Sequence, residues 1–367
     1  MNHAILSPSS AHRWLTCTPS ARLEQQFGDT ESVYAAEGTF AHALAEWLIK
    51  HPDQPLPADF TDNSFFSQAM VEFVTMYTDE VKRKTDSDSN LFLEQELDLS
   101  EYAPESFGHA DAVILNDKTL DVIDLKYGAG VPVSAVNNPQ LRLYALGVYS
   151  EWAFLYDFDS VTMTIVQPRN GGISSETLSV DDLLRWGDTV KPLAKLAFDG
   201  KGDFKPGNHC RFCKAADKCR ALADYHLACV NDDFDSPDLL DDDEISEILS
   251  RADSVIKWLE SVKAYALKEA LNNGKKWHGF KLVEGRSNRK IVDAEGAARL
   301  LKDSGADDSD IWKTRELLTL TALEKNFGKK RLADLLGDLI HKPPGAPTLV
   351  DDSDPRPEFN SAVNDFA

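Results

Sequence analysis

The chain has 367 residues, of which 42% are hydrophobic and 27% charged, and its formal net charge is −22. This composition is typical of a globular protein, and the length suits about two domains. The sequence contains no run of about 18 apolar residues, which argues against a membrane protein. The negative charge argues against a protein held to nucleic acid by bulk electrostatics, although a local basic groove remains compatible with it.

The first half of the chain alternates predicted helices and strands. Apolar residues recur at helical spacing in 34–50 and 65–84, whereas 91–99 alternates like a strand. Two β-branched runs, HADAVIL and LDVIDLK, flank the short turn NDKT and predict a hairpin. A helix beginning at the cap Asn138, a strand over 160–168 and a helix over 180–198 follow. This order predicts an α/β fold, with a mixed sheet flanked by helices.

The acidic stretch NDDFDSPDLLDDDEISE, residues 231–247, contains no Lys or Arg and is typical of a solvated linker. Beyond it we expect a long amphipathic helix, a short strand or hairpin with a basic flank, and further helices. We therefore expect a first domain over 1–230, a mostly helical domain over 231–341 and a Pro- and Asp-rich tail over 342–367.

Asp111, Asp124 and Lys126 form the most informative polar pattern. Residues two apart in a strand share a face, so Asp124 and Lys126 point the same way, and the hairpin brings Asp111 near them. Two carboxylates suit Mg²⁺, and the lysine can hold a water and offset charge on a phosphate. The alternative is a surface pair, against which the apolar neighbours in VIDL argue.

Other polar residues extend this pattern. His42 stands on the polar side of the helix over 34–50, where simple solvation is the alternative. Gln140 and Tyr144 are four residues apart and share a helix face. Glu94 and Glu96 share one face of the preceding strand, and geometry alone does not choose between them.

Three of the five cysteines form a C-x2-C-x5-C triplet. In a reducing compartment such a cluster favours a metal over a disulfide. Zinc accepts four thiolates, but structural zinc sites usually combine C-x2-C with another close pair. A [4Fe–4S] cluster takes four thiolates and tolerates asymmetric spacing. The triplet is Cys210, Cys213 and Cys219, and the others are Cys17 and Cys229.

These residues resemble the ordered motifs of RecB-like nucleases in the PD-(D/E)XK superfamily. The matching motifs are His42 in GTFAHALAE, Asp111 in GHADAVI, Asp124-x-Lys126 in VIDLKYG and Gln140-x3-Tyr144 in QLRLYA. Some members, such as CRISPR-associated RecB-like exonucleases and the AddB subunit, carry one early and three late cysteines that bind an iron–sulfur cluster. The motifs span about residues 10–225, and the whole chain also resembles a phage and prophage family of unassigned function.

The resemblance implies a restriction-endonuclease-like core and a Mg²⁺- or Mn²⁺-dependent deoxyribonuclease, more an exonuclease than a site-specific endonuclease. It implies that His42, Asp111, Asp124 and the Leu125 carbonyl bind the metal. Lys126 would position the attacking water, Gln140 and Tyr144 would support the site, and Glu96 is weakly preferred over Glu94 as an outer acid. It also implies a [4Fe–4S] cluster on Cys17, Cys210, Cys213 and Cys219, which would stabilise the whole first domain by joining its two ends.

The expected partners are DNA, as single strands or duplex ends, and phage replication or recombination proteins, with no membrane. The N-terminal residues lack a secretory signal pattern, so we expect a phage- or prophage-encoded protein in the bacterial cytoplasm. The segment KKWHGFKLVEGRSNRK either follows DNA phosphates or is a solvated hairpin; its candidate contacts are Lys281, Arg286, Arg289 and Lys290. Two alternatives to the enzyme stay open, a non-catalytic DNA-binding scaffold and a zinc-binding regulator.

Overall fold

The fold is taken from a computed structural model, in which the chain divides into two compact units, Met1–Ile248 and Leu249–Ala367. We expected a boundary near residue 230, but the division falls inside the long helix α9 (Asp242–Asn273). The structure describes residues 4–28, 33–128, 130–170, 172–228, 242–285, 289–313, 316–341, 343, 345–351 and 357–359.

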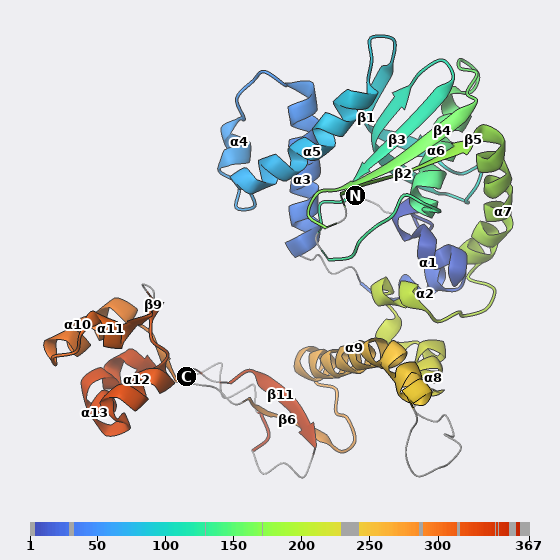
Figure 1. The fold of residues 1–367 in the computed structure, drawn as a ribbon. Helices are drawn as coiled ribbons and strands as arrows, with labels where there is room; N and C mark the ends of the chain where they lie inside the picture. Colours follow the sequence, from blue (N-terminus) through green and yellow to red (C-terminus); the bar gives the residue numbers. More distant parts are fainter. Residues whose placement is uncertain are drawn as a thin grey trace. The chain divides into compact units, whose positions relative to one another are not determined.

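Unit 1 is built on one five-stranded sheet in the order β1-β2-β3-β4-β5 (Figure 1). Only β3 and β4 are parallel, and helix α6 (Pro139–Trp152) makes the crossover between them. The expected α/β fold with a mixed sheet is therefore confirmed. The strands are β1 (Asn90–Asp98), β2 (Phe107–Leu115), β3 (Thr119–Leu125), β4 (Ser160–Gln167) and β5 (Gly172–Ser179).

Helices cover both faces of this sheet and create two apolar cores. Helices α3 and α5 lie on one face, where their apolar stripes pack against residues such as Ile123. Helices α6, α7 and α1 contribute to the core on the other face, which includes Val122. The helices and 3₁₀ turns of unit 1 are η1 (Pro8–Ser10), α1 (Ala11–Thr16), α2 (Ser20–Glu24), α3 (Val33–Lys50), α4 (Ala58–Thr61), α5 (Gln68–Lys84), α7 (Val180–Asp199), η2 (Asn208–Phe212), η3 (Ala216–Lys218) and α8 (Arg220–Ala228).

The helix that follows β3 begins where the sequence predicts. The Asn138 side chain accepts hydrogen bonds from the amides of Gln140 and Leu141, and Pro139 fills the first helical position. This cap fixes the first turn of α6 against the end of β3. It therefore determines where the side chain of Gln140 lies relative to Lys126.

Strand β5 is absent from the sequence expectation, which had four strands in this domain. Its sequence, GISSETLS, is mostly small and polar, and its burial alternates only between half-buried and exposed. As an edge strand it is held by its ladder to β4 and by side-chain hydrogen bonds such as Thr164 to Ser175. The pattern of apolar residues therefore does not predict strand β5.

Among the residues that the structure describes, unit 2 contains most of α9, four further α-helices and several short strands. For the basic segment the sequence predicts a short strand or a hairpin; in the structure, β6 pairs with β11 and β7 with β10. A small apolar core that includes Leu301 and Leu323 lies among the helices. The elements are β6 (Phe280–Glu284), β7 (Lys290–Ile291), α10 (Ala294–Asp303), α11 (Asp308–Ile311), β8 (Trp312–Lys313), β9 (Glu316–Leu317), α12 (Leu320–Phe327), α13 (Lys329–Leu336), η4 (Gly337–Leu339), β10 (Ile340–His341) and β11 (Pro347–Asp351).

A mostly helical C-terminal region thus agrees with the sequence expectation. Among the helices that the structure describes, none combines the length and the apolar character needed to cross a bilayer.

Candidate metal centre

Asp111 and Asp124 come together on the β2–β3 hairpin. The antiparallel register pairs Ala112 with Ile123, so the two aspartates occupy the next opposing positions. Asp111 Oδ2 accepts a hydrogen bond of 2.7 Å from the amide of Leu125. The carboxylate of β2 is therefore anchored to the end of β3, as the spacing predicts.

Helix α3 brings His42 to the same place. Its Nδ1 lies 3.3 Å from Asp111 Oδ1 and 3.9 Å from Glu94 Oε1. The potential ligand atoms of His42, Glu94 and Asp111 all lie within 4.8 Å of one another. One nitrogen and two carboxylates at this separation form a donor set for a divalent cation such as Mg²⁺ or Mn²⁺.

Glu94, and not Glu96, joins this group. Glu96 is exposed on β1, whereas Glu94 has a positive φ of 50°, which is uncommon for a residue with a side chain. Leu93 packs in the core beside α3, but Leu97 packs in the core beside α6. Odd-numbered side chains of β1 therefore change face around Glu94, and the regular alternation that would place Glu94 and Glu96 on one face does not hold.

Lys126, directly after β3, is held by two partners. Its Nζ lies 2.8 Å from Asp124 Oδ2, and it donates a hydrogen bond of 3.0 Å to Gln140 Oε1. Gln140 Nε2 in turn lies within hydrogen-bond distance of Asp124 Oδ1, at 3.0 Å, and of the Tyr144 hydroxyl, at 3.3 Å. The helical pair predicted from the sequence thus orients both the lysine and the aspartate.

The Asp124 carboxylate is almost completely buried. Among the described residues, its Oδ2 has no partner in hydrogen-bond geometry, even though Lys126 Nζ is close. Burial raises the pKa of Asp124, Lys126 opposes this rise, and Asp111 adds to it. A buried carboxylate oxygen with an unused lone pair beside a second carboxylate fits a cation ligand.

Negative charge is crowded around His42. Burial raises the pKa of Glu94 to about 7, and the neighbouring Asp111 adds to the rise. Burial lowers the pKa of His42, but the nearby carboxylates, Asp111 first, outweigh it and raise the value to about 9. A bound cation would reduce the repulsion between the carboxylates of Glu94 and Asp111.

Two residues of this site escaped the sequence analysis. Tyr77 of α5 is buried, and its pKa is raised by burial and then by Asp111 and Asp124. Gly108 on β2 lies under α6, because a Cβ there would come within 2.8 Å of Tyr144 Cε1 and 3.0 Å of Pro8 Cγ. A buried tyrosine in an amphipathic helix and a glycine in a strand give no signal of a site in one sequence.

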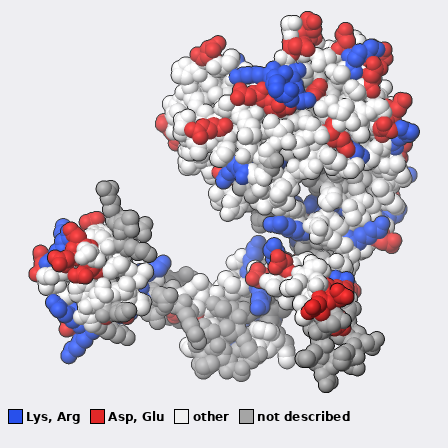
Figure 2. Space-filling view, viewed as in Figure 1, with Lys and Arg blue, Asp and Glu red and all other residues white. Residues whose placement is uncertain are grey.

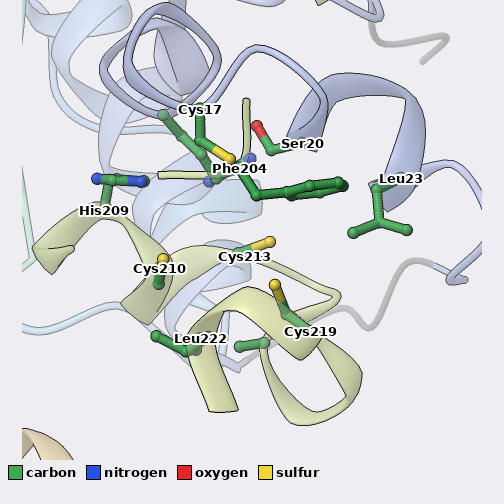
Figure 3. A pocket seen from close by; sticks show the side chains of 11 residues that line it. Cys17, Ser20, Leu23, Phe204, His209, Cys210, Cys213, Cys219 and Leu222 are labelled. Atoms are coloured by element: carbon green, nitrogen blue, oxygen red, sulfur yellow. The ribbon is translucent and has the colours of Figure 1, made fainter. Parts of the chain in front are cut away.

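Four cysteines line a single pocket at the C-terminal end of α1 (Figure 3). Cys17 caps the C-terminus of α1, Cys210 lies in η2, and Cys213 and Cys219 follow η2 and η3. Figure 3 shows their sulfur atoms turned toward the space between them. They form no disulfide, and the space that they line is partly open to solvent.

Protein contacts also hold this pocket together. Arg13 Nη2 lies 2.7 Å from Glu24 Oε2, and Arg13 Nη1 donates to the carbonyl of Phe212. Glu24 Oε1 accepts a hydrogen bond from the amide of Lys214. The loop that carries Cys213 is thus tied to α1 and α2 by a partly buried ion pair.

Burial raises the pKa of the Cys210 thiol, and it raises that of the Cys213 thiol to about 12, so burial favours the protonated form of these two side chains. A metal or cluster would therefore displace protons when it binds. Cys229 lies outside the described residues.

The expected DNA contacts of unit 2 stay a prediction. Arg289 forms an ion pair with Glu324, while Lys281 and Lys290 lie on β6 and β7. Arg286 lies outside the described residues. The proposed role of the Leu125 carbonyl as a ligand likewise stays a prediction.

The family described as "Protein of unknown function (DUF2800)" matches residues 3–357. The chain belongs to this family. A solved structure described as "Crystal structure of SSO0001" is 14% identical, and the match covers 56% of this chain and 95% of that chain. Its TM-score of 0.26 is too low to support an argument about fold. For this DUF2800 protein, the side-chain geometry must therefore support any functional proposal.

Proposed function

We propose that this DUF2800 protein is a metal-dependent nuclease that hydrolyses phosphodiester bonds of DNA, on a restriction-endonuclease-like core. The observation that supports it most is the convergence of Asp111, Asp124 and Lys126 with His42 from α3. A surface pair would not place Asp124 in the protein interior, where its Oδ2 has no partner in hydrogen-bond geometry among the described residues. Buried, crowded carboxylates mark functional sites more than structural ones.

His42, Glu94, Asp111 and Asp124 are the residues that would hold Mg²⁺ or Mn²⁺. Such an ion, when bound, acts as a Lewis acid on the phosphate and lowers the pKa of a coordinated water. Lys126 would hold a water or a non-bridging phosphate oxygen through its ammonium group. Gln140 keeps Lys126 in this orientation, because its amide accepts from the lysine and also contacts Asp124.

The cysteine pocket supports a second resident group, a [4Fe–4S] cluster. Four thiolates around one zinc ion lie about 3.8 Å apart, since tetrahedral Zn–S bonds are about 2.3 Å long. Among the described cysteines, no three sulfur atoms lie within 4.8 Å of one another. A cluster does not need the four thiolates to come this close to one another, because each would bind a different iron. The four cysteines would hold it in a structural role.

End-labelled linear DNA and circular single-stranded DNA, incubated with Mg²⁺ or Mn²⁺, test the proposal. An exonuclease releases the label from linear DNA and leaves the circle intact, whereas an endonuclease cuts both. Absence of cleavage by iron-loaded protein would instead favour a non-catalytic DNA-binding scaffold. A colourless protein with stoichiometric zinc would support the zinc alternative for the cysteines.

A further inference from the structure

The segment that carries three of the cysteines differs in charge from the rest of the chain. Residues 200–220, here called the cysteine lobe, contain six Lys or Arg residues and two Asp residues, in a chain of net charge −22. All six cationic residues are exposed. Figure 2 shows blue side chains on this part of unit 1, around α2 and the chain that follows α7. The six are Lys201, Lys205, Arg211, Lys214, Lys218 and Arg220.

Aromatic side chains lie among these cations. Phe212 is 63% exposed and Phe204 46% exposed, although both are large apolar residues. The guanidinium of Arg211 lies over the Phe212 ring, with 5.6 Å between Cζ and the ring centroid. Arg13 holds the Phe212 carbonyl, so this segment has a fixed position on the domain. Exposed aromatic rings beside cations are the surface that proteins use to bind unpaired bases.

A short helical segment joins this lobe to the acidic site. Its first end, Pro8, packs against Gly108 beside Tyr144. Its last end is Cys17, in the cysteine pocket. At a rise of 1.5 Å per residue, the two ends are roughly 14 Å apart. Ser9, His12 and Thr16 are exposed along this segment and are polar.

We propose that the cysteine lobe is a binding site for single-stranded nucleic acid. Lys205 and Arg211 contact phosphates, and Phe212 stacks on an unpaired base. The exposed rings favour an unpaired strand over a duplex, whose bases are already stacked. This deepens the proposed nuclease function, and rests on it, because the lobe would hold the strand a few nucleotides from Asp124 and Lys126.

Binding can be measured without cleavage. Fluorescence anisotropy of a labelled oligothymidylate, in EDTA and at several salt concentrations, compares the natural protein with the double variant R211A/F212A. The matched control is R185A/F154A, whose side chains in the natural protein are exposed elsewhere on unit 1, at 74% and 80%. We expect the lobe variant to bind about tenfold or more weakly. Its affinity should also depend less steeply on salt, and the control should bind within about twofold of the natural protein.

Iron content and the melting temperature show whether the lobe variant keeps its fold. If it does not, K205E against the control K118E carries the test, because Lys205 lies outside the cysteine triplet. Unchanged affinity in folded lobe variants would overturn the proposal. Equal or tighter binding of the same strand annealed to its complement would overturn the single-strand assignment, and weaker binding supports it.

The same experiment separates this proposal from the nuclease proposal. If the protein binds single strands through the lobe but cleaves no DNA, the nuclease function is refuted and the binding role of the lobe stands. If the protein cleaves DNA and the lobe substitutions do not change this, the binding role of the lobe is refuted and the nuclease function stands. If K205E binds DNA with unchanged affinity but melts at a different temperature from the natural protein, the lobe contacts an acidic protein segment instead of DNA, and the proposal fails.

Discussion

Lys126 Nζ donates a hydrogen bond of 3.0 Å to Gln140 Oε1, so the first turn of α6 fixes the lysine at the end of β3. The same amide contacts Asp124 through its nitrogen, at 3.0 Å. One side chain therefore sets the relative orientation of the proposed metal ligand and the proposed water-positioning group.

The substitution Gln140→Ala should lower kcat for DNA cleavage about 10- to 100-fold, as is usual for residues that orient a metal site. KM should change little, because Lys126 acts on the transition state more than on the bound strand. Gln68→Ala, on the exposed first position of α5, is the control and should keep full activity. A purely structural role for Gln140 would instead lower the melting temperature and leave kcat of the folded fraction unchanged.

Glu94→Gln should weaken Mn²⁺ binding roughly tenfold or more, because it removes a carboxylate from the group around His42. Glu96→Gln, two residues along the same strand, should leave Mn²⁺ affinity unchanged. Isothermal titration calorimetry on both variants makes the comparison. Equal losses, or a loss only in Glu96→Gln, would contradict the arrangement of β1.

The comparison of Glu94 with Glu96 also shows what the strand pattern in the sequence cannot predict. The sequence predicts that Asp111, Asp124 and Lys126 lie close together. The prediction needs only a hairpin and side chains that alternate in regular strands. Glu94 could not be chosen, because the positive φ at this residue reverses the faces of β1. Local backbone departures of this kind depend on tertiary packing, which a strand pattern does not encode.

Long-range neighbours were only partly accessible from the sequence. The resemblance to iron–sulfur nucleases, and not the spacing, joined Cys17 to the distant triplet, and the common pocket agrees with it. The partners of β6 and β7 were missed, because two short strands close in sequence favour a hairpin. Their real partners, β11 and β10, follow after helices α10 to α13 and carry no pairing signal of their own.

Cys17→Ser should remove the cluster, and with it the brown colour and the bound iron and sulfide. The melting temperature should fall as well, because the cluster joins the first helix to the end of the domain. Cys229→Ser, at the cysteine outside the proposed set, should keep its iron. Full iron content and visible absorption in Cys17→Ser would contradict the four-cysteine site.

Glu24→Gln should destabilise unit 1 by about 1–3 kcal/mol, because it leaves Arg13 without its charged partner at a partly buried site. Glu24 is 8% exposed and binds both Arg13 and the amide of Lys214. Asp157→Asn breaks an exposed pair with Lys118 and should have little effect. Urea unfolding measures both, and similar midpoints for the two variants would argue against a supporting role for Glu24.

The most direct test of the nuclease proposal compares two substitutions of buried aspartates on β3. Asp124→Asn removes the proposed metal ligand, whereas Asp121→Asn breaks an ion pair of 2.6 Å with Lys84 on the opposite face. Cleavage of labelled linear DNA with Mn²⁺ is measured for both variants and for the natural protein, each with its iron content matched. The natural protein and Asp121→Asn should cleave the DNA, and Asp124→Asn should not. Cleavage that persists in Asp124→Asn, or its absence from the natural protein, would contradict the account.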